Sequence, residues 1–98
     1  MRLSPSEFEA AVAIMQASGL GEVEVRDYAP SNCEPFRSAK VERRGVPNAD
    51  TPALVAQLAS LAILTGAHLV LYTLGDHCDI DVSVTMDLPE AEAEVSRG

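Results

Sequence analysis

The stretch Asp79-Ile80-Asp81-Val82-Ser83-Val84-Thr85-Met86 decides the fold of this chain. Polar and apolar residues alternate along all of it, which is the period of a β-strand with one face in a core and the other in solvent. The preceding run, 68–74, is apolar at almost every position and is typical of a central strand. A polar turn at Gly75 and Asp76 lies between the two runs, so together they predict an antiparallel hairpin.

A helix is predicted directly before this hairpin. Thr51 and Pro52 have the residue types of a helix start, and Gly66 has the type of a helix end. The helix has apolar residues on more than one side and no charged residue, whereas a surface helix normally has a charged side. We therefore expect it to contribute a surface for self-association, and the alternative is a bland exposed face of small and uncharged polar residues. The predicted interface residues are Leu54, Leu58, Leu61 and Leu64.

The first half of the chain repeats this order of elements. Ser4, Pro5 and Glu7 predict a capping box at the start of a helix over 5–18, and Gly19 ends it. Alternating residues over 22–28 predict a strand, and a less regular run over 36–43 predicts its hairpin partner across a long, proline-containing loop.

An internal duplication explains the recurrence economically. Pro5 and Gly19 recur as Pro52 and Gly66, both 47 positions later. The predicted fold class is therefore α+β, in two layers and in the order αββαββ, with two helices on one face of a four-stranded antiparallel sheet. We expect one domain over 1–86 and an acidic C-terminal tail over 87–98, frayed or disordered. The expected sheet core consists of Val23, Val25, Ala39, Val41, Leu69, Leu71, Ile80, Val82 and Val84.

Such a sheet leaves one face without helices, and this face supplies the candidate binding site. Acidic residues would flank an apolar strip at Val70, Tyr72 and Leu74, in which Tyr72 is an aromatic anchor and the acids attract a basic partner. The alternative is an ordinary solvated sheet face. The predicted partner-binding residues are Glu22, Glu24, Tyr72, Asp79 and Asp81.

The charge of the chain narrows the classes of partner. Its 98 residues have a formal net charge of −8, which disfavours direct binding to nucleic acid or to an anionic membrane. The N-terminal sequence has no apolar run of the signal-peptide type, so we expect a cytoplasmic protein with reduced cysteines. The acidic half could imitate the charges of a nucleic-acid backbone, or it could simply favour solubility.

Basic residues gather in one short segment. Arg37, Lys40, Arg43 and Arg44 are four of the seven lysines and arginines. We interpret the segment as a charged edge strand, which resists pairing with other sheets, and the alternative is a phosphate-binding role.

One cluster has residues with the chemistry of metal binding or nucleophilic catalysis. Asp76-His77-Cys78-Asp79 lies at the predicted turn, but adjacent residues of an extended segment point apart, so Cys33 and His68 would have to complete a site. The simpler interpretation is a polar turn in which Cys78 packs as a small apolar residue. The sequence thus predicts no metal, no cofactor and no catalytic residue.

Our leading hypothesis is a protein-binding module without enzymatic activity, an inhibitor or adaptor that docks its acidic sheet face on a basic surface of a larger protein. That target could itself bind nucleic acid. The alternative is a small metal-binding or Cys/His-dependent enzyme domain centred on residues 76–79, and a homodimer through the uncharged helix is compatible with either.

Overall fold

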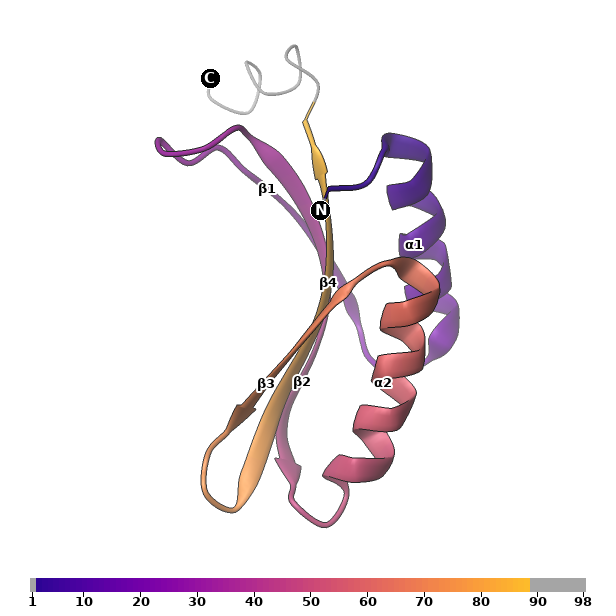
Figure 1. Cartoon of the computed structure of the whole chain (residues 1–98), viewed down its shortest axis with the longest axis vertical. Helices are drawn as coiled ribbons and strands as arrows, with labels where there is room; N and C mark the ends of the chain where they lie inside the picture. The colour runs from indigo at the N-terminus through magenta and orange to yellow at the C-terminus, as the bar shows by residue number, and fades with distance from the viewer. Residues whose placement is uncertain (1, 89–98) are drawn as a thin grey trace.

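The two αββ units predicted from the sequence are both present in the computed structural model, which describes residues 2–88. The first unit consists of helix α1 (Pro5–Ser18) and strands β1 (Val23–Tyr28) and β2 (Phe36–Pro47). The second consists of α2 (Thr51–Thr65), β3 (His68–Thr73) and β4 (His77–Asp87). Both helices cover the same face of one twisted antiparallel sheet, and no helix of the described residues lies on its other face (Figure 1). The α+β class and the αββαββ order are confirmed.

The sheet places corresponding strands of the two units in corresponding positions. Its order is β1-β2-β4-β3, so β2 and β4 are central and β1 and β3 are the edges. The prediction of a central strand over 68–74 was therefore wrong, because β3 pairs in the described sheet with β4 alone. At the centre Ala39 pairs with Val84, and these two residues become equivalent in the repeat when two loop residues are removed from the 47-residue offset. A twofold relation between the units requires such a pairing, because residues on the axis face their own equivalents. The 47-residue offset, however, aligns Val23 with Val70, which the register places on opposite faces of the sheet, so the duplication stays a prediction.

The first helix begins as the sequence predicts. The Ser4 side chain accepts a hydrogen bond from the Glu7 amide, and the Glu7 carboxylate accepts one from the Ser4 amide, which completes the capping box. In the second unit the N-cap is Asp50, one residue earlier than predicted, and its side chain makes no capping hydrogen bond. Thr51 instead donates its hydroxyl to the Pro47 carbonyl at 3.0 Å.

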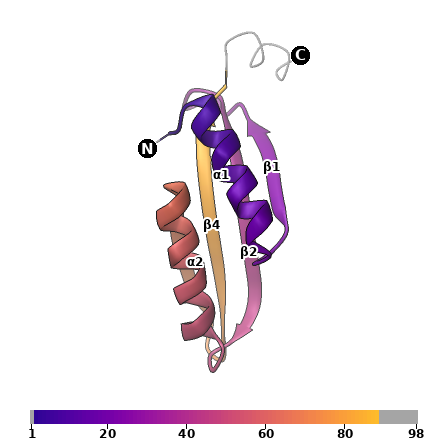
Figure 2. The same ribbon diagram turned by 90° about the vertical axis from the view of Figure 1, so that its right-hand side faces the viewer.

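The core lies between the helices and the central strands (Figure 2). Met15 of α1 and Leu58 of α2 are completely buried against the inward-facing residues of β2 and β4. Cys78 is also completely buried, which confirms that it packs as a small apolar residue. Five predicted core residues are buried as expected: Ala39, Val41, Ile80, Val82 and Val84.

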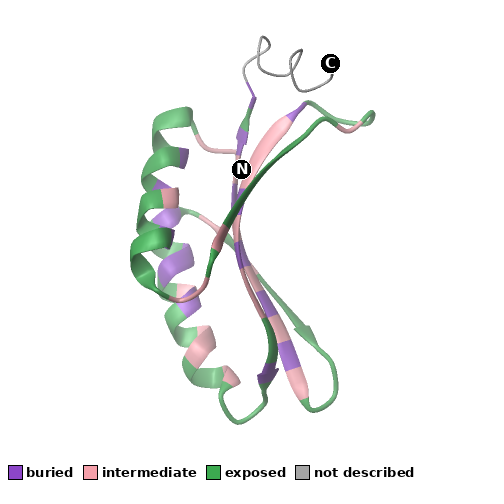
Figure 3. Ribbon diagram, turned by 180° about the vertical axis from the view of Figure 1, so that it is seen from behind, coloured by how far each residue is buried: buried purple, intermediate pink, exposed green. Residues whose placement is uncertain are grey.

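The predicted core was wrong at the sheet edges. Val25 and Leu71 have 47% and 41% of their surface exposed, although the register places both on the face that the helices cover. Val23 and Leu69, nearer the helices, are partly buried. Two helices cover the middle of a four-stranded twisted sheet but not the far ends of its edge strands, and Figure 3 shows β3 exposed along most of its length.

Strand ends also differ from the prediction. The second strand continues to Pro47 because the register shifts between Arg43 and Val46, as in a β-bulge, and then resumes. At the other end of the sheet, Asp87 belongs to β4 and Leu88 is buried, so the packed chain extends two residues beyond the predicted boundary at 86. The rest of the predicted tail, 89–98, lies outside the described residues.

Candidate functional site

The sheet face opposite the helices, called the open face below, holds the side chains that the alternation placed there. Because Val41 and Val82 point to the helices, their neighbours along each strand point away from them. The open face therefore includes polar residues of the central strands and apolar residues of β3. Its main members are Glu22, Glu24, Arg26, Lys40, Glu42, Val70, Tyr72, Asp79 and Asp81.

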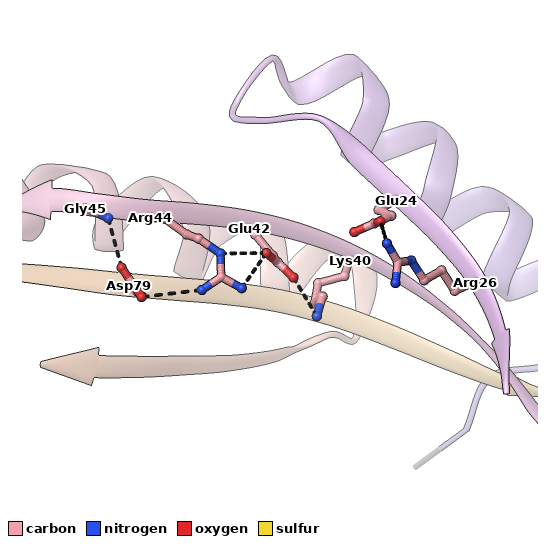
Figure 4. Close-up of polar contacts among 7 residues, drawn as sticks. All are labelled: Glu24, Arg26, Lys40, Glu42, Arg44, Gly45 and Asp79. Atoms are coloured by element: carbon pink, nitrogen blue, oxygen red, sulfur yellow. Dashed lines mark hydrogen bonds and ion pairs between the residues drawn. The ribbon is translucent and has the colours of Figure 1, made fainter. Parts of the chain in front are cut away.

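Ion pairs run along β2 in the middle of the open face (Figure 4). The Glu42 carboxylate lies 2.7 Å from the Lys40 ammonium and 2.8 Å from a terminal nitrogen of the Arg44 guanidinium. Arg44 also reaches the Asp79 carboxylate at 3.5 Å. Our interpretation of the basic segment as an edge strand was wrong, because β2 is paired on both sides. Its cations instead lie between the acidic residues of β1 and β4.

The ion pairs along β2 favour the charged forms of Glu42 and Lys40. Hydrogen bonds from Lys40 and Arg44 hold the pKa of the Glu42 carboxyl below its usual value, and Glu42 in turn raises the pKa of the Lys40 ammonium. Both groups are thus ionised near neutral pH. The middle of the open face is a mixed, internally compensated surface and not a uniformly acidic one.

The predicted partner-binding residues fall into two separate places. In the β3·β4 register Tyr72 pairs with Asp79, and Asp81 pairs with Val70, the next residue of β3 on the same face. The predicted residues Tyr72, Asp79 and Asp81 therefore lie side by side. Glu24 lies on β1, with β2 and β4 between it and Tyr72, and it forms an ion pair with Arg26. Glu22 directly precedes β1 and lies at the same edge as Glu24. The structure therefore brings together Tyr72, Asp79 and Asp81 and separates them from Glu22 and Glu24.

The Asp79 side chain also binds the backbone of β2, a contact that the sequence did not indicate. Its carboxylate accepts a hydrogen bond from the Gly45 amide at 2.9 Å, and its side chain is only 18% exposed. Gly45 has a φ of 65° and lies at the register shift of β2, a conformation that favours glycine. The signal available in the sequence was a glycine within a strand, which often marks a bulge.

The neighbouring apolar surface is larger than the predicted binding site. Val70, Tyr72 and Leu74, here called the apolar strip, are 40%, 52% and 50% exposed. Leu71, on the helix-covered face of β3, and Ile63 and Leu64, in the last turn of α2, are further exposed apolar residues that lie outside the open face. A charge-free segment from 51 to 75 was the sequence signal for this surface.

The predicted self-association surface on α2 is mostly inside the molecule. Leu58 and Leu61 are buried in the core of the same chain, and Leu54 is partly buried. Leu64 alone among the four is mostly exposed, at 71%. The spacing of the leucines marked the inner face of the helix, which the sheet covers.

The 76–79 cluster does not converge on a common point. The His77 Nδ1 atom lies 2.8 Å from the Asp76 carboxylate, which lowers the pKa of that carboxyl. Cys78 is buried on the helix-covered side, while Cys33 is exposed in the 29–35 loop. Within residues 2–88 no group of three or more His, Cys, Asp or Glu side chains is arranged to hold a metal ion.

Comparisons with protein-family models, with curated proteins and with solved structures find no match to this chain. In the described range, neither helix has the length and apolar character that crossing a membrane requires.

Proposed function

We propose that this protein is a protein-binding module that docks through the β3·β4 side of its open face onto a basic surface of a larger protein. The observation that carries the proposal is the register of these two strands. It places the exposed Tyr72 beside Asp79 and the exposed Val70 beside Asp81 on the sheet face that neither α1 nor α2 covers.

Tyr72 is suited to be the anchor of such a contact. Aromatic side chains give a large contact area for a small loss of conformational freedom, and tyrosine is enriched among the residues that contribute most to binding. Val70 and Leu74 extend the apolar area on both sides of it. Apolar side chains surrounded by polar groups are the usual anatomy of a protein interface.

The carboxylates beside the strip define the chemistry of the partner. Asp81 pairs in register with Glu42 on one side and Val70 on the other, so two acidic residues adjoin at this point. A lysine or arginine of a partner can approach these acids and lay its aliphatic stem on the apolar strip. Proteins that bind nucleic acids present basic surfaces of this kind, so an inhibitor or adaptor of such a protein fits the site.

The test compares two charge reversals of equal size. Asp81→Lys lies in the proposed site, whereas Glu22→Lys lies at the opposite edge of the same face and changes the net charge equally. Wild-type protein and both variants are used as baits in extracts of the native host, together with Tyr72→Ala. Proteins retained by the wild type are identified by mass spectrometry, and a retained protein is then purified for calorimetric titration.

We expect a specific partner to lose at least about tenfold in affinity with Asp81→Lys and with Tyr72→Ala, and to bind Glu22→Lys almost as well as the wild type. Circular dichroism confirms that each variant is folded. Equal binding to all four proteins, or equal weakening by the two charge reversals, contradicts the proposed site.

A further inference from the structure

Within residues 2–88, the outer edge of β3 has backbone groups that no other strand pairs with. The Leu74 amide donates to the His77 carbonyl at 2.9 Å, which fixes the phase of the β3·β4 ladder. Bonded and non-bonded pairs alternate in an antiparallel ladder, so residues 70 and 72 direct their amides and carbonyls to β4. The backbone groups of Leu69, Leu71 and Thr73 therefore point outward from the edge of the described sheet.

The two edges of the sheet differ in how they are protected. β1 contains Glu24, Arg26 and Asp27, and charged side chains on an edge strand discourage pairing with another strand. β3 has the sequence His-Leu-Val-Leu-Tyr-Thr, with no Asp, Glu, Lys or Arg, and apolar side chains on both of its faces. An exposed, uncharged and apolar edge is a template for a further strand.

We propose that the occupant of this edge is the β3 strand of a second copy of the chain. Two antiparallel β3 strands would join the sheets of two molecules into one continuous sheet, with all four helices on the same side. The pairing is related by a twofold axis, so one strand supplies both halves of the contact.

The distribution of charge along the chain favours a second copy as the occupant of the β3 edge. A chain with a net charge of −8 repels its own copies over most of its surface. The segment 51–75, which includes α2 and β3, has no charged residue, so two copies can approach there without placing like charges opposite each other. The exposed Ile63 and Leu64 at the end of α2 extend the uncharged area into the helix layer.

The outward-pointing groups also select the register. With Leu71 on the twofold axis, Leu71 pairs with Leu71 of the partner subunit, and Leu69 pairs with Thr73 of the partner subunit. All three outward-pointing residues then find hydrogen-bond partners. On the open face Val70 lies opposite Tyr72 of the partner subunit, and pairs of an aromatic with a β-branched residue stabilise sheets. The contact is made by the backbone edge of β3, so it does not depend on the proposed function, although Val70 and Tyr72 belong to both surfaces.

The first experiment measures mass against concentration by sedimentation equilibrium for the wild type, Leu71→Lys and Val25→Lys. Leu71→Lys places two like charges opposite each other on the axis, while Val25→Lys puts the same charge at a similarly exposed position of β1. We expect the wild type to dimerise, Leu71→Lys to weaken the dimer at least about tenfold, and Val25→Lys to leave it unchanged. A wild-type monomer up to millimolar concentration overturns the proposal, and so does a dimer that survives Leu71→Lys.

The second experiment does not depend on how well the lysine variants fold. Leu71→Cys and Val25→Cys are each made together with Cys33→Ser, which removes the exposed natural thiol. Residues directly opposite across an antiparallel pair are within disulfide range. Mild oxidation should therefore produce a covalent dimer of Leu71→Cys and not of Val25→Cys. Equal cross-linking of the two variants, or none in either, contradicts a β3 contact.

Discussion

The two αββ units have the same architecture but differ in how their polar groups are used. The first has a complete capping box, a charged edge strand, and an ion pair in which Arg37 contacts Asp27 at 2.7 Å. The second has a helix start without side-chain capping and an edge strand without charge. The units share one core, so the difference concerns their surfaces. It teaches that the two edge strands differ in charge: β1 has charged side chains along its edge, whereas β3 has none.

The largest loss of stability is expected from substitutions in the core that the two units share. Met15→Ala in α1 and Leu58→Ala in α2 each remove a completely buried side chain from the shared core. Each should lower the free energy of unfolding by about 2–5 kcal/mol, since both leave a cavity. Urea denaturation followed by circular dichroism should give a single transition for both variants. Two separate transitions would mean that the units have separate cores.

A smaller loss of stability is expected from a substitution just before the edge strand β1. A Cβ atom added at Gly21, just before β1, would lie 2.7 Å from Cγ1 of Val41, a buried side chain of β2. Gly21→Ala should therefore destabilise the protein by about 1–3 kcal/mol through overpacking. By the 47-residue offset the equivalent position of the second unit is His68, whose side chain is exposed.

The matched control for Gly21→Ala is a double-mutant cycle with Val41→Ala. Removing the Val41 methyl groups should relieve the contact, so the two changes together should be less harmful than their sum. Additive effects would show that the contact is not the cause.

Removal of the N-cap side chain should lower stability at α1 but not at α2, and by less than the substitutions above. Ser4→Ala removes the acceptor for the Glu7 amide and should lower the free energy of unfolding by about 1 kcal/mol. Asp50→Ala should have almost no effect, because the Asp50 side chain makes no capping hydrogen bond. Thermal or urea denaturation of the two variants measures the difference, and equal losses would contradict the asymmetry.

The smallest expected change in stability comes from the ion pair of Asp27 and Arg37, and it depends on pH. Hydrogen bonds from Arg37 hold the pKa of the Asp27 carboxyl below its ordinary value. A carboxyl whose pKa is lowered by folding stabilises the fold above its unfolded pKa, which is about 4, and this contribution is lost as the pH falls through the folded pKa. Asp27→Asn should therefore reduce stability by up to about 1 kcal/mol at pH 7 and by less at pH 3.

Urea denaturation of the wild type and Asp27→Asn at the two pH values provides the measurement. The same difference at both would show that the ion pair contributes nothing through its charge. The carboxyls of Glu7, Glu42 and Asp76 also have lowered pKa values, so acid should weaken the shared fold through these groups as well.

Much of the fold could be predicted from local patterns. Alternation along 79–86 and the paired proline and glycine signals identified the elements, because capping and strand periodicity are properties of neighbouring residues. The same alternation correctly assigned each strand residue to one of the two faces. It could not show how far the helices extend over the sheet, so it placed Val25 and Leu71 in the core, where the structure leaves them exposed.

The candidate site was predictable only in part for the same reason. The sequence identified Tyr72, Asp79 and Asp81 as members of one face, but it could not show that β2 separates them from Glu22 and Glu24. It also treated the basic segment as an edge, whereas pairing with two neighbours makes that strand central. Strand order depends on contacts between residues that are distant in the chain, and no local pattern reports them.

The sequence by itself determined the elements, their order, the two faces of each strand, and a charge-free segment within an acidic chain. Only the tertiary structure decided which strands are edges, which carboxylates form ion pairs with lysine and arginine, and that the uncharged segment ends in an edge strand of the described sheet. The physical reason is that periodicity and capping act over a few residues, whereas pairing and coverage depend on how the two units meet.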